Sequence, residues 1–358
     1  MIRFALSLCL MLAAIPARAA VDIQEITTPG GIDVWLVESH EIPFVALEIR
    51  FQGGASLDAP GKRGAINLMS GLLEEGAADL DAQGFAAARD ALAARFSFSA
   101  YNDALSVSAQ FLTENRDQAV ELLHQALVNP RFDADAVERV RGQVLSGIRS
   151  DERDPDEIAA RTFNALAFGD HPYGTPIEGS VETVTALTRD DIVAAKDRVM
   201  ARDRLFVSAV GDIDAQTLGA LVDRLFDGLP QTGADMPGPA NFALSGGVTV
   251  VPFDTPQSVA IFGHNGIARE DPDFFAAFVL NSVLGGGGFS SRLMEEVREK
   301  RGLTYGVSSY LYTMDRADLV LGKVASANEK MAEAVQVIRD QWARAATDGI
   351  TQEELDTV

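Results

Sequence analysis

The chain has 358 residues, of which 47% are apolar, so it can bury a large core and its length suggests two domains. Its 30 basic and 52 acidic residues give a net charge of −22, which repels nucleic acid and anionic lipid surfaces. These numbers favour a globular protein and argue against a nucleic-acid partner.

The first twenty residues, MIRFALSLCLMLAAIPARAA, contain an early Arg3, an apolar run and a small-residue site ending at Ala19. This order is typical of a secretory signal peptide, and the apolar run is too short to span a bilayer comfortably. Cys9, the only cysteine, lies inside this segment. We therefore expect an exported protein, most simply periplasmic, with no membrane span, disulfide or cysteine ligand in its mature form.

Strand and helix patterns then alternate through the first half of the chain. Residues 21–50 read as three strands, VDIQEITT, IDVWLVES and FVALEIRF, with a hairpin turn at Pro29-Gly30-Gly31. Further strands are expected in ARFSFSAYN, ALSVSAQFL and RLFVSAVG. Helical periodicity marks residues 63–75, 81–94, 116–128, 133–151 and 190–199. Together these patterns predict one α+β domain over residues 21–230.

The second half repeats the first. A stretch rich in Pro, Gly and Ala, LPQTGADMPGPANFALSGG, is typical of a linker, placed here at residues 231–246. Beyond it, GVTVVPFDTPQSVAIFGHNG reads as a strand pair like the first one, and SANEKMAEAVQVIRDQW matches TENRDQAVELLHQAL at an offset of about 213 residues. The predicted fold class is α+β, with two tandem homologous domains of antiparallel-rich sheet flanked by helices. We expect the second, at 247–358, to be an incomplete copy, because the sequence stops in the helix ITQEELDTV.

Four consecutive glycines suggest a phosphate loop at first sight: Gly285, Gly286, Gly287 and Gly288. The run follows a helical segment, AAFVLNSVL, and no Lys-Ser/Thr comes after it, so it does not match a P-loop or a dinucleotide fingerprint. The pattern favours a flexible joint between two helices, with Ser290 or Ser291 as the N-cap of the second.

The residues alone predict neither a zinc site nor a serine hydrolase. The histidines are isolated, and no two of them share a helix face at i, i+4. They are His40, His124, His171 and His264. No serine lies in a G-x-S-x-G elbow.

Arg298 and Tyr305 form a further candidate pair, seven residues apart. The helix SSRLMEEVREKRG should end at Gly302, and LTYGVSSYLY should begin a strand, so the two side chains can point into one space. A guanidinium and a phenol are both suited to hold a peptide carbonyl or the oxyanion it becomes. The alternative is that Arg298 pairs with neighbouring glutamates or solvent and that Tyr305 is a packed strand aromatic.

The segment SSRLMEEVREKRGLTYGVSS closely resembles the C-terminal half of the pitrilysin, insulinase and mitochondrial processing peptidase family of inverted-motif zinc peptidases. LGGGGFSSRL, HPYGTPIEG and LFVSAVGDID also look like stretches of that family. The resemblance covers essentially everything after the signal peptide. It implies the same architecture of duplicated α+β domains.

In that family zinc is held by H-x-x-E-H on a helix of the first domain and by a glutamate on a later helix. In the matching stretch, GKRGAINLMSGLLEEGA, the two histidines and the glutamate are replaced by Asn67, Gly71 and Ser70, respectively. Ser146 and Gly147 stand where the later helix would carry its acids. The resemblance therefore implies that this chain binds no metal cofactor itself.

Glu74 and Glu75 survive beside the degenerate motif but lack imidazole partners. We interpret both as surface acids.

The resemblance implies a function in a complex. Some members are heterodimers in which a homologous subunit carries the zinc, while the zinc-lacking subunit keeps an arginine and a tyrosine that match Arg298 and Tyr305 here. The chain would then be the non-zinc subunit of a periplasmic metalloendopeptidase, closing the chamber and presenting both residues to the carbonyl of a peptide or unfolded polypeptide substrate. The glycine run matches a substrate-guiding loop of the mitochondrial enzyme but is much shorter, so the joint remains the favoured interpretation. Two alternatives stay open: a purely structural or assembly subunit, and a peptide-binding subunit without catalytic contribution.

Overall fold

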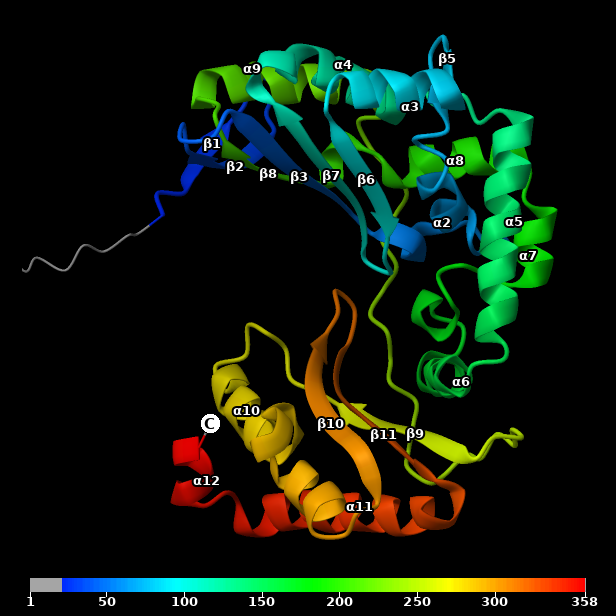
Figure 1. Cartoon of the computed structure of the whole chain (residues 1–358), viewed down its shortest axis with the longest axis vertical. Coiled ribbons are helices and arrows are strands. Elements are labelled where there is room, and N and C mark those ends of the chain that lie inside the picture. The colour runs from blue at the N-terminus through cyan, green and yellow to red at the C-terminus, as the bar shows by residue number, and fades with distance from the viewer. Residues whose placement is uncertain (1–20, 358) are drawn as a thin grey trace, which may run out of the picture.

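The structure is a computed structural model that describes residues 21–357, and the predicted signal peptide lies outside these residues. Two α+β domains follow one another along the chain, one built on a six-stranded sheet and the other on a three-stranded sheet (Figure 1). Between residues 21 and 357, no helix has the length and apolarity that crossing a bilayer would require.

The first sheet has the strand order β1-β2-β8-β3-β7-β6. Its strands are β1 (Gln24–Thr27), β2 (Asp33–Glu38), β3 (Phe44–Gln52), β6 (Arg95–Ala100), β7 (Ala104–Leu112) and β8 (Leu205–Gly211), and a small hairpin, β4 (Gly76–Ala77) and β5 (Leu80–Asp81), lies apart. All neighbours in the large sheet are antiparallel except β2 and β8, which run parallel. The strands predicted for this domain are confirmed, including the β1–β2 hairpin.

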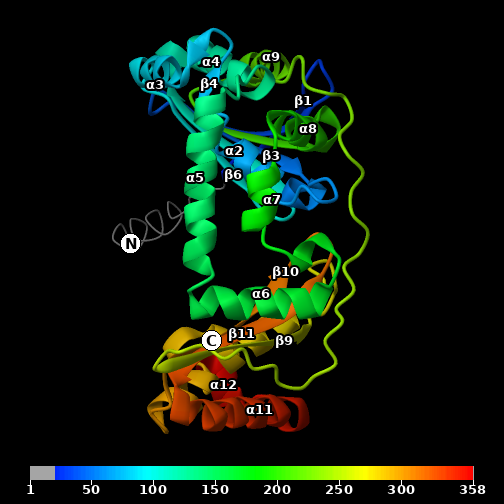
Figure 2. The ribbon, with the colours of Figure 1, turned by 90° about the vertical axis from the view of Figure 1, so that its right-hand side faces the viewer.

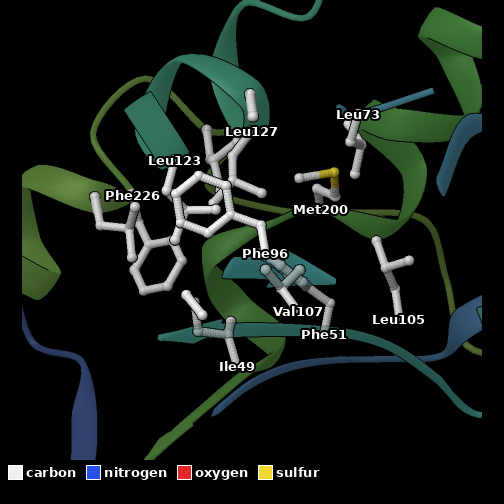
Figure 3. Packing of buried hydrophobic residues seen from close by; sticks show 14 of the residues in the cluster. Ile49, Phe51, Leu73, Phe96, Leu105, Val107, Leu123, Leu127, Met200 and Phe226 are labelled. Atoms are coloured by element: carbon white, nitrogen blue, oxygen red, sulfur yellow. The ribbon is translucent and has the colours of Figure 1, made fainter. Parts of the chain in front are cut away.

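Within residues 21–357, helices cover one face of this sheet and leave the other uncovered. In Figure 1, α3 (Ala82–Ala91), α4 (Arg116–Val128) and α9 (Ala215–Leu225) lie on the side turned away from the second domain. Alternate residues of β3 point into this layer, where Phe51 packs edge-on against Phe226 at 6.1 Å between ring centroids (Figure 3). The opposite face of the sheet is left open toward the second domain.

The remaining helices of the first domain lie beyond one end of the sheet. They are α2 (Ala65–Ser70), α5 (Ala134–Asp151), α6 (Pro155–Phe168), α7 (Val181–Ala186) and α8 (Arg189–Val199). The predicted α4 is confirmed to the residue, whereas α2 is much shorter than the predicted 63–75, because Gly64 at φ 96° precedes it and turns follow from Gly71.

The second domain repeats part of the first. Its sheet, in the order β10-β11-β9, contains β9 (Gln257–Asn265), β10 (Thr304–Thr313) and β11 (Asp318–Ala327), all antiparallel. At the predicted offset, β10, β11 and β9 correspond to β6, β7 and β3, which are neighbours in the same order in the first sheet. Its helices are α10 (Phe274–Asn281), α11 (Met331–Asp348) and α12 (Gln352–Thr357). Because α11 takes the place of α4 after the hairpin, the tandem duplication is confirmed.

The strand pair predicted in GVTVVPFDTPQSVAIFGHNG is wrong in its first half. Only β9 forms there, and residues 248–253 are not a strand, with Val250 77% exposed. The counterpart in the first domain, β2, is held between β1 and β8. Within residues 21–357 no strand pairs with 248–253, so these backbone groups have no ladder to join.

Helix α6 joins the two domains. It lies across the second sheet in Figure 2, and Phe168 packs with Tyr173 and Leu319 in a small cluster between the domains. The Tyr173 hydroxyl donates to Asp103 at 2.5 Å and accepts from the backbone N–H of Arg316 at 3.1 Å. These contacts fix the open face of the first sheet opposite the second domain.

Candidate functional site

A pocket of about 650 Å³ lies in the second domain, where α10, the glycine run and β10 meet. Phe274, Phe278 and Phe289 give it apolar walls, and Arg269 and Tyr310 are among its polar lining residues. A concave site with apolar walls and a few polar groups is the usual form of a binding site, so this pocket is the candidate.

The glycine run makes one wall of the pocket. Gly285 lies close to β10. A Cβ atom on it would lie 2.4 Å from the hydroxyl oxygen of Ser309, so only glycine fits at this position. Gly288 has φ +61°, a value that L side chains rarely adopt. Because the run begins at the end of a π-helical turn (Ser282–Gly286) and a new helix follows it, the run is the joint that the sequence predicts.

Ser291 caps the helix after the joint. Its Oγ accepts from the backbone N–H of Met294 at 3.4 Å, while Ser290 donates to the carbonyl of Gly287 at 2.9 Å. Of the two predicted N-caps, the structure therefore selects Ser291.

Arg298 lies in a π-helical stretch (Met294–Glu299) on the far side of this joint. Its guanidinium carbon lies 4.7 Å from the centre of the Phe289 ring, a cation–π geometry, and its Nε is 3.4 Å from Glu299. Gly302 ends the helix as predicted, with φ +59° and its N–H donating to the carbonyl of Arg298 at 2.8 Å. Arg298 thus pairs with a neighbouring glutamate and also stacks on a wall of the pocket.

Tyr305 stands at the start of β10 and is 87% exposed, so it is not a packed strand aromatic. A bulge between Thr304 and Gly306 interrupts the ladder at this point, and Gly306 lines the pocket. No hydrogen bond joins Tyr305 to Arg298 in the part of the chain that the structure describes. Neither residue lines the pocket itself: Arg298 stacks on the lining residue Phe289, and Tyr305 precedes the lining residue Gly306 in the chain.

The degenerate motif lies on α2, at the other end of the molecule. Asn67 is half-buried, Ser70 is buried and donates to the carbonyl of Asn67 at 2.8 Å, and a Cβ atom on Gly71 would lie 3.1 Å from the Val140 side chain of α5. No group of three histidine, cysteine, aspartate or glutamate side chains that could hold a metal forms within residues 21–357. An amide, a hydroxyl and a glycine do not fit zinc, so no step through a metal follows for this chain.

Ser146 and Gly147 are both exposed on α5. Neither position offers a side chain that could complete a zinc site.

Glu74 and Glu75 are not the simple surface acids that the sequence suggests. Glu75 receives two hydrogen bonds from Arg139, at 2.8 and 2.6 Å, a bidentate pair that ties α5 to the end of the motif region. Glu74 is half-buried against Arg89, and burial raises the pKa of its carboxyl. Both glutamates therefore have structural roles, each pairing with an arginine on a helix.

Sequence reasoning missed the buried Asp58 before α2. Its two carboxylate oxygens accept from the backbone N–H groups of Gly64 and Ile66, each at 2.9 Å, and Arg63 lies 3.6 Å away. Burial nonetheless raises the pKa of Asp58 to about 6. The residue lies six positions ahead of the helix cap, Gly64, so no standard capping pattern reveals it.

Two family descriptions match this chain. Residues 33–181 match "Insulinase (Peptidase family M16)", and residues 186–358 match "Peptidase M16 inactive domain".

Known proteins with similar chains carry two kinds of name. An "uncharacterized zinc protease" of Mycobacterium tuberculosis is 30% identical over 340 residues, which is 94% of this chain and 77% of the relative. The "non-peptidase homolog YmxG" of Helicobacter pylori is 28% identical over 340 residues, covering 94% of this chain and 78% of that protein. A crystal structure of a peptidase M16 inactive domain from Pseudomonas fluorescens superposes with a TM-score of 0.87 at 30% identity, over 94% of this chain and 82% of that one.

Proposed function

The chain belongs to the insulinase family, peptidase family M16, and on that premise we propose that it is the zinc-lacking subunit of a heterodimeric metalloendopeptidase. Asn67, Ser70 and Gly71 supply no zinc ligand and no base that could activate water. A homologous subunit that carries zinc would provide both. The substrate would be a peptide or an unfolded polypeptide segment.

The position of Arg298 and Tyr305 beside the pocket is the observation that carries this proposal. Arg298 is held over Phe289, and the exposed hydroxyl of Tyr305 is free to meet a ligand from the partner's side. A charged guanidinium and a phenol can donate hydrogen bonds to a peptide carbonyl and more strongly to the oxyanion formed from it. Their contribution would therefore be to stabilise the tetrahedral intermediate while the partner's metal acts on the opposite side.

Export is part of the proposal. The signal-peptide features of the first twenty residues support a working complex in the periplasm. The naming of a similar H. pylori protein as a non-peptidase homolog supports the view that a chain of this type does not cleave peptides by itself.

The test is to purify the chain together with a homologous partner that has an intact H-x-x-E-H motif and to measure cleavage of an unstructured peptide. We expect Arg298→Ala or Tyr305→Phe to lower kcat by about 100-fold with little change in KM, because the lost donor acts mainly in the transition state. Arg344→Ala and Tyr312→Phe, which change exposed residues of the same types elsewhere in the domain, should leave kcat unchanged.

The same measurement separates the alternatives. An unchanged kcat in both site variants would rule out the catalytic contribution. A rise in KM alone would show a peptide-binding subunit, an outcome that the apolar walls of the pocket also favour. If no complex with a zinc-bearing homologue cleaves peptides, the purely structural role stands.

A further inference from the structure

The helical segment after the glycine joint carries four cations, and carboxylates bind three of them. Arg292 donates to both carboxylate oxygens of Glu354, at 2.7 and 2.8 Å. Lys300 and Arg301 both donate to the carboxylate of Glu296, at 2.7 and 2.6 Å. These three positive charges are therefore neutralised by charge-assisted hydrogen bonds within the chain.

Arg298, the fourth cation, donates no side-chain hydrogen bond to any residue between 21 and 357. Its Nε lies 3.4 Å from Glu299, whose side chain is 60% exposed, so this is a weak surface pairing. The closer support is the ring of Phe289, whose centre lies 4.7 Å from the guanidinium carbon. An aromatic face thus holds this charge where acids hold the other three.

This difference decides which atoms of Arg298 remain available. A guanidinium carries its five N–H donors in its own plane, and a carboxylate that binds it occupies some of them. An aromatic ring attracts the same charge through its π face, without an acceptor atom. Stacking on Phe289 therefore holds Arg298 and leaves its donors free for a carbonyl oxygen.

The glycine joint fixes the backbone around Phe289. The carbonyl of Gly287 accepts from the hydroxyl of Ser290 at 2.9 Å, and the carbonyl of Gly288 accepts from the hydroxyl of Ser291 at 2.8 Å. Phe289 lies between these two closed turns, so the joint sets the place of its ring.

The backbone of Arg298 is fixed from its own side. It belongs to the π-helical stretch Met294–Glu299, in which the N–H of Lys300 donates to the carbonyl of Glu295, five residues back, at 2.9 Å. Stretches of this kind are rare and recur at functional sites. Since both backbones are fixed, only the side-chain torsions of Arg298 need further support, and the ring supplies it.

We propose that Phe289 is a positioning residue for Arg298: its ring holds the guanidinium in place and leaves the N–H donors free for the carbonyl of the substrate. This inference rests on the proposed function, to which it adds a residue that acts through Arg298. It also gives the glycine joint a purpose, because the joint places the ring.

The free chain tests the contact itself. A proton that lies over an aromatic ring resonates upfield, so the Nε–Hε signal of Arg298 should lie upfield in a proton–nitrogen correlation spectrum at mildly acidic pH. Arg298→Lys identifies this signal by its absence. Phe289→Leu keeps an apolar side chain without a π face and should move the signal to the position of an exposed arginine, whereas Phe289→Trp should keep it upfield. Because the Phe289 ring is 71% exposed, neither change should disturb folding.

The complex with a zinc-bearing homologue tests the consequence for catalysis. We expect Phe289→Leu to lower kcat by about fivefold with little change in KM, because an arginine that samples other rotamers donates less often to the transition state. Phe289→Trp should restore most of the wild-type kcat. In an Arg298→Ala background, Phe289→Leu should cost nothing further, because no guanidinium is left to position.

Phe275→Leu is the matched control. It changes a phenylalanine of the same domain that does not line the pocket, so it should leave both the Arg298 signal and kcat unchanged.

Three results would overturn the inference. The first is an Arg298 signal that stays in place in Phe289→Leu, and the second is an unchanged kcat in Phe289→Leu when Arg298→Ala lowers kcat. The third is a further loss of kcat from Phe289→Leu in the Arg298→Ala background, which would show that Phe289 acts on the substrate as a wall of the pocket. If instead Arg298→Ala itself leaves kcat unchanged, the proposed function fails, and the signal in the free chain still decides whether Phe289 holds the guanidinium.

Discussion

The two sheets of this chain share three equivalent strands but bury very different cores. In the first, β8 returns from far along the sequence to pair with both β2 and β3, and the core beneath includes Phe51, Phe85, Phe111 and Phe226. In the second, β9 pairs only with β11 within the described residues, and its core is a smaller cluster around Leu293 and Val297. Within the described residues, a long-range strand thus extends the three shared strands of the first sheet, and the second sheet has no such strand.

The helices that follow the first equivalent strand differ in the same way. Helix α2 is buried, with its N-terminus bound to the buried Asp58. Helix α10 leaves Phe275 and Phe278 exposed, and Asp271, the counterpart of Asp58, makes only local contacts at the surface. The copy with the degenerate motif is thus the more deeply buried one, and the less buried copy carries the pocket.

The largest expected effect tests whether the first core dominates stability. Phe51→Ala removes a fully buried ring that packs on Phe226, so it should lower the free energy of unfolding by about 3–5 kcal/mol. Urea unfolding followed by Trp35 fluorescence, in the Trp342→Phe background, reports on this domain.

Phe275→Ala is the matched control from the second domain. Its ring is 76% exposed, so the change should stay within about 0.5 kcal/mol. Equal losses in the two variants would contradict the contrast between the cores.

Much of this contrast could be read from the sequence, but its cause could not. Alternation gave the strands of the first domain, and the repeat gave the second domain its order. The segment 248–253, wrongly predicted as a strand, has the same alternation as β2, but strand formation needs hydrogen-bonding neighbours. Strand β2 has two, β1 beside it in the sequence and β8 at a separation of about 170 residues. Local patterns do not contain that information.

The sequence likewise indicated only part of the candidate site. The motif around Arg298 and Tyr305 and the joint at the glycines were recognisable. The stacking of Arg298 on Phe289 and the π-helical form of its helix were not, because they depend on how the joint folds back on β10.

The next effect concerns the two equivalent aspartates. Because the folded state raises the pKa of Asp58 to about 6 from an ordinary value of 3.8, the carboxyl binds its proton more tightly when folded. Its contribution to stability is complete below pH 4 and is lost as the pH rises to 6, by about 3 kcal/mol at 1.4 kcal/mol per pKa unit. Asp58→Asn should remove this fall, as measured by urea unfolding at intervals between pH 4 and 7.

Asp271→Asn changes the exposed counterpart of Asp58 in the second domain. In this variant the free energy of unfolding should depend on pH as it does in the wild type. A profile for Asp58→Asn parallel to that of the wild type would show that the carboxyl before α2 does not titrate in this range.

The smallest expected effect asks whether α2 retains the geometry of a metal site. Asn67→His with Gly71→His would restore two imidazoles at i, i+4, but Ser146 and Gly147 on α5 still offer no carboxylate as a third ligand. We expect 100 µM zinc to stabilise this variant by less than about 1 kcal/mol relative to an Asn67→Ala, Gly71→Ala control. Stabilisation by several kcal/mol, with one zinc per chain kept through dialysis against a chelator, would show instead that the first domain lost only its ligands. A weak response would show that the loss extends to α5, and that any metal opposite Arg298 must come from another chain.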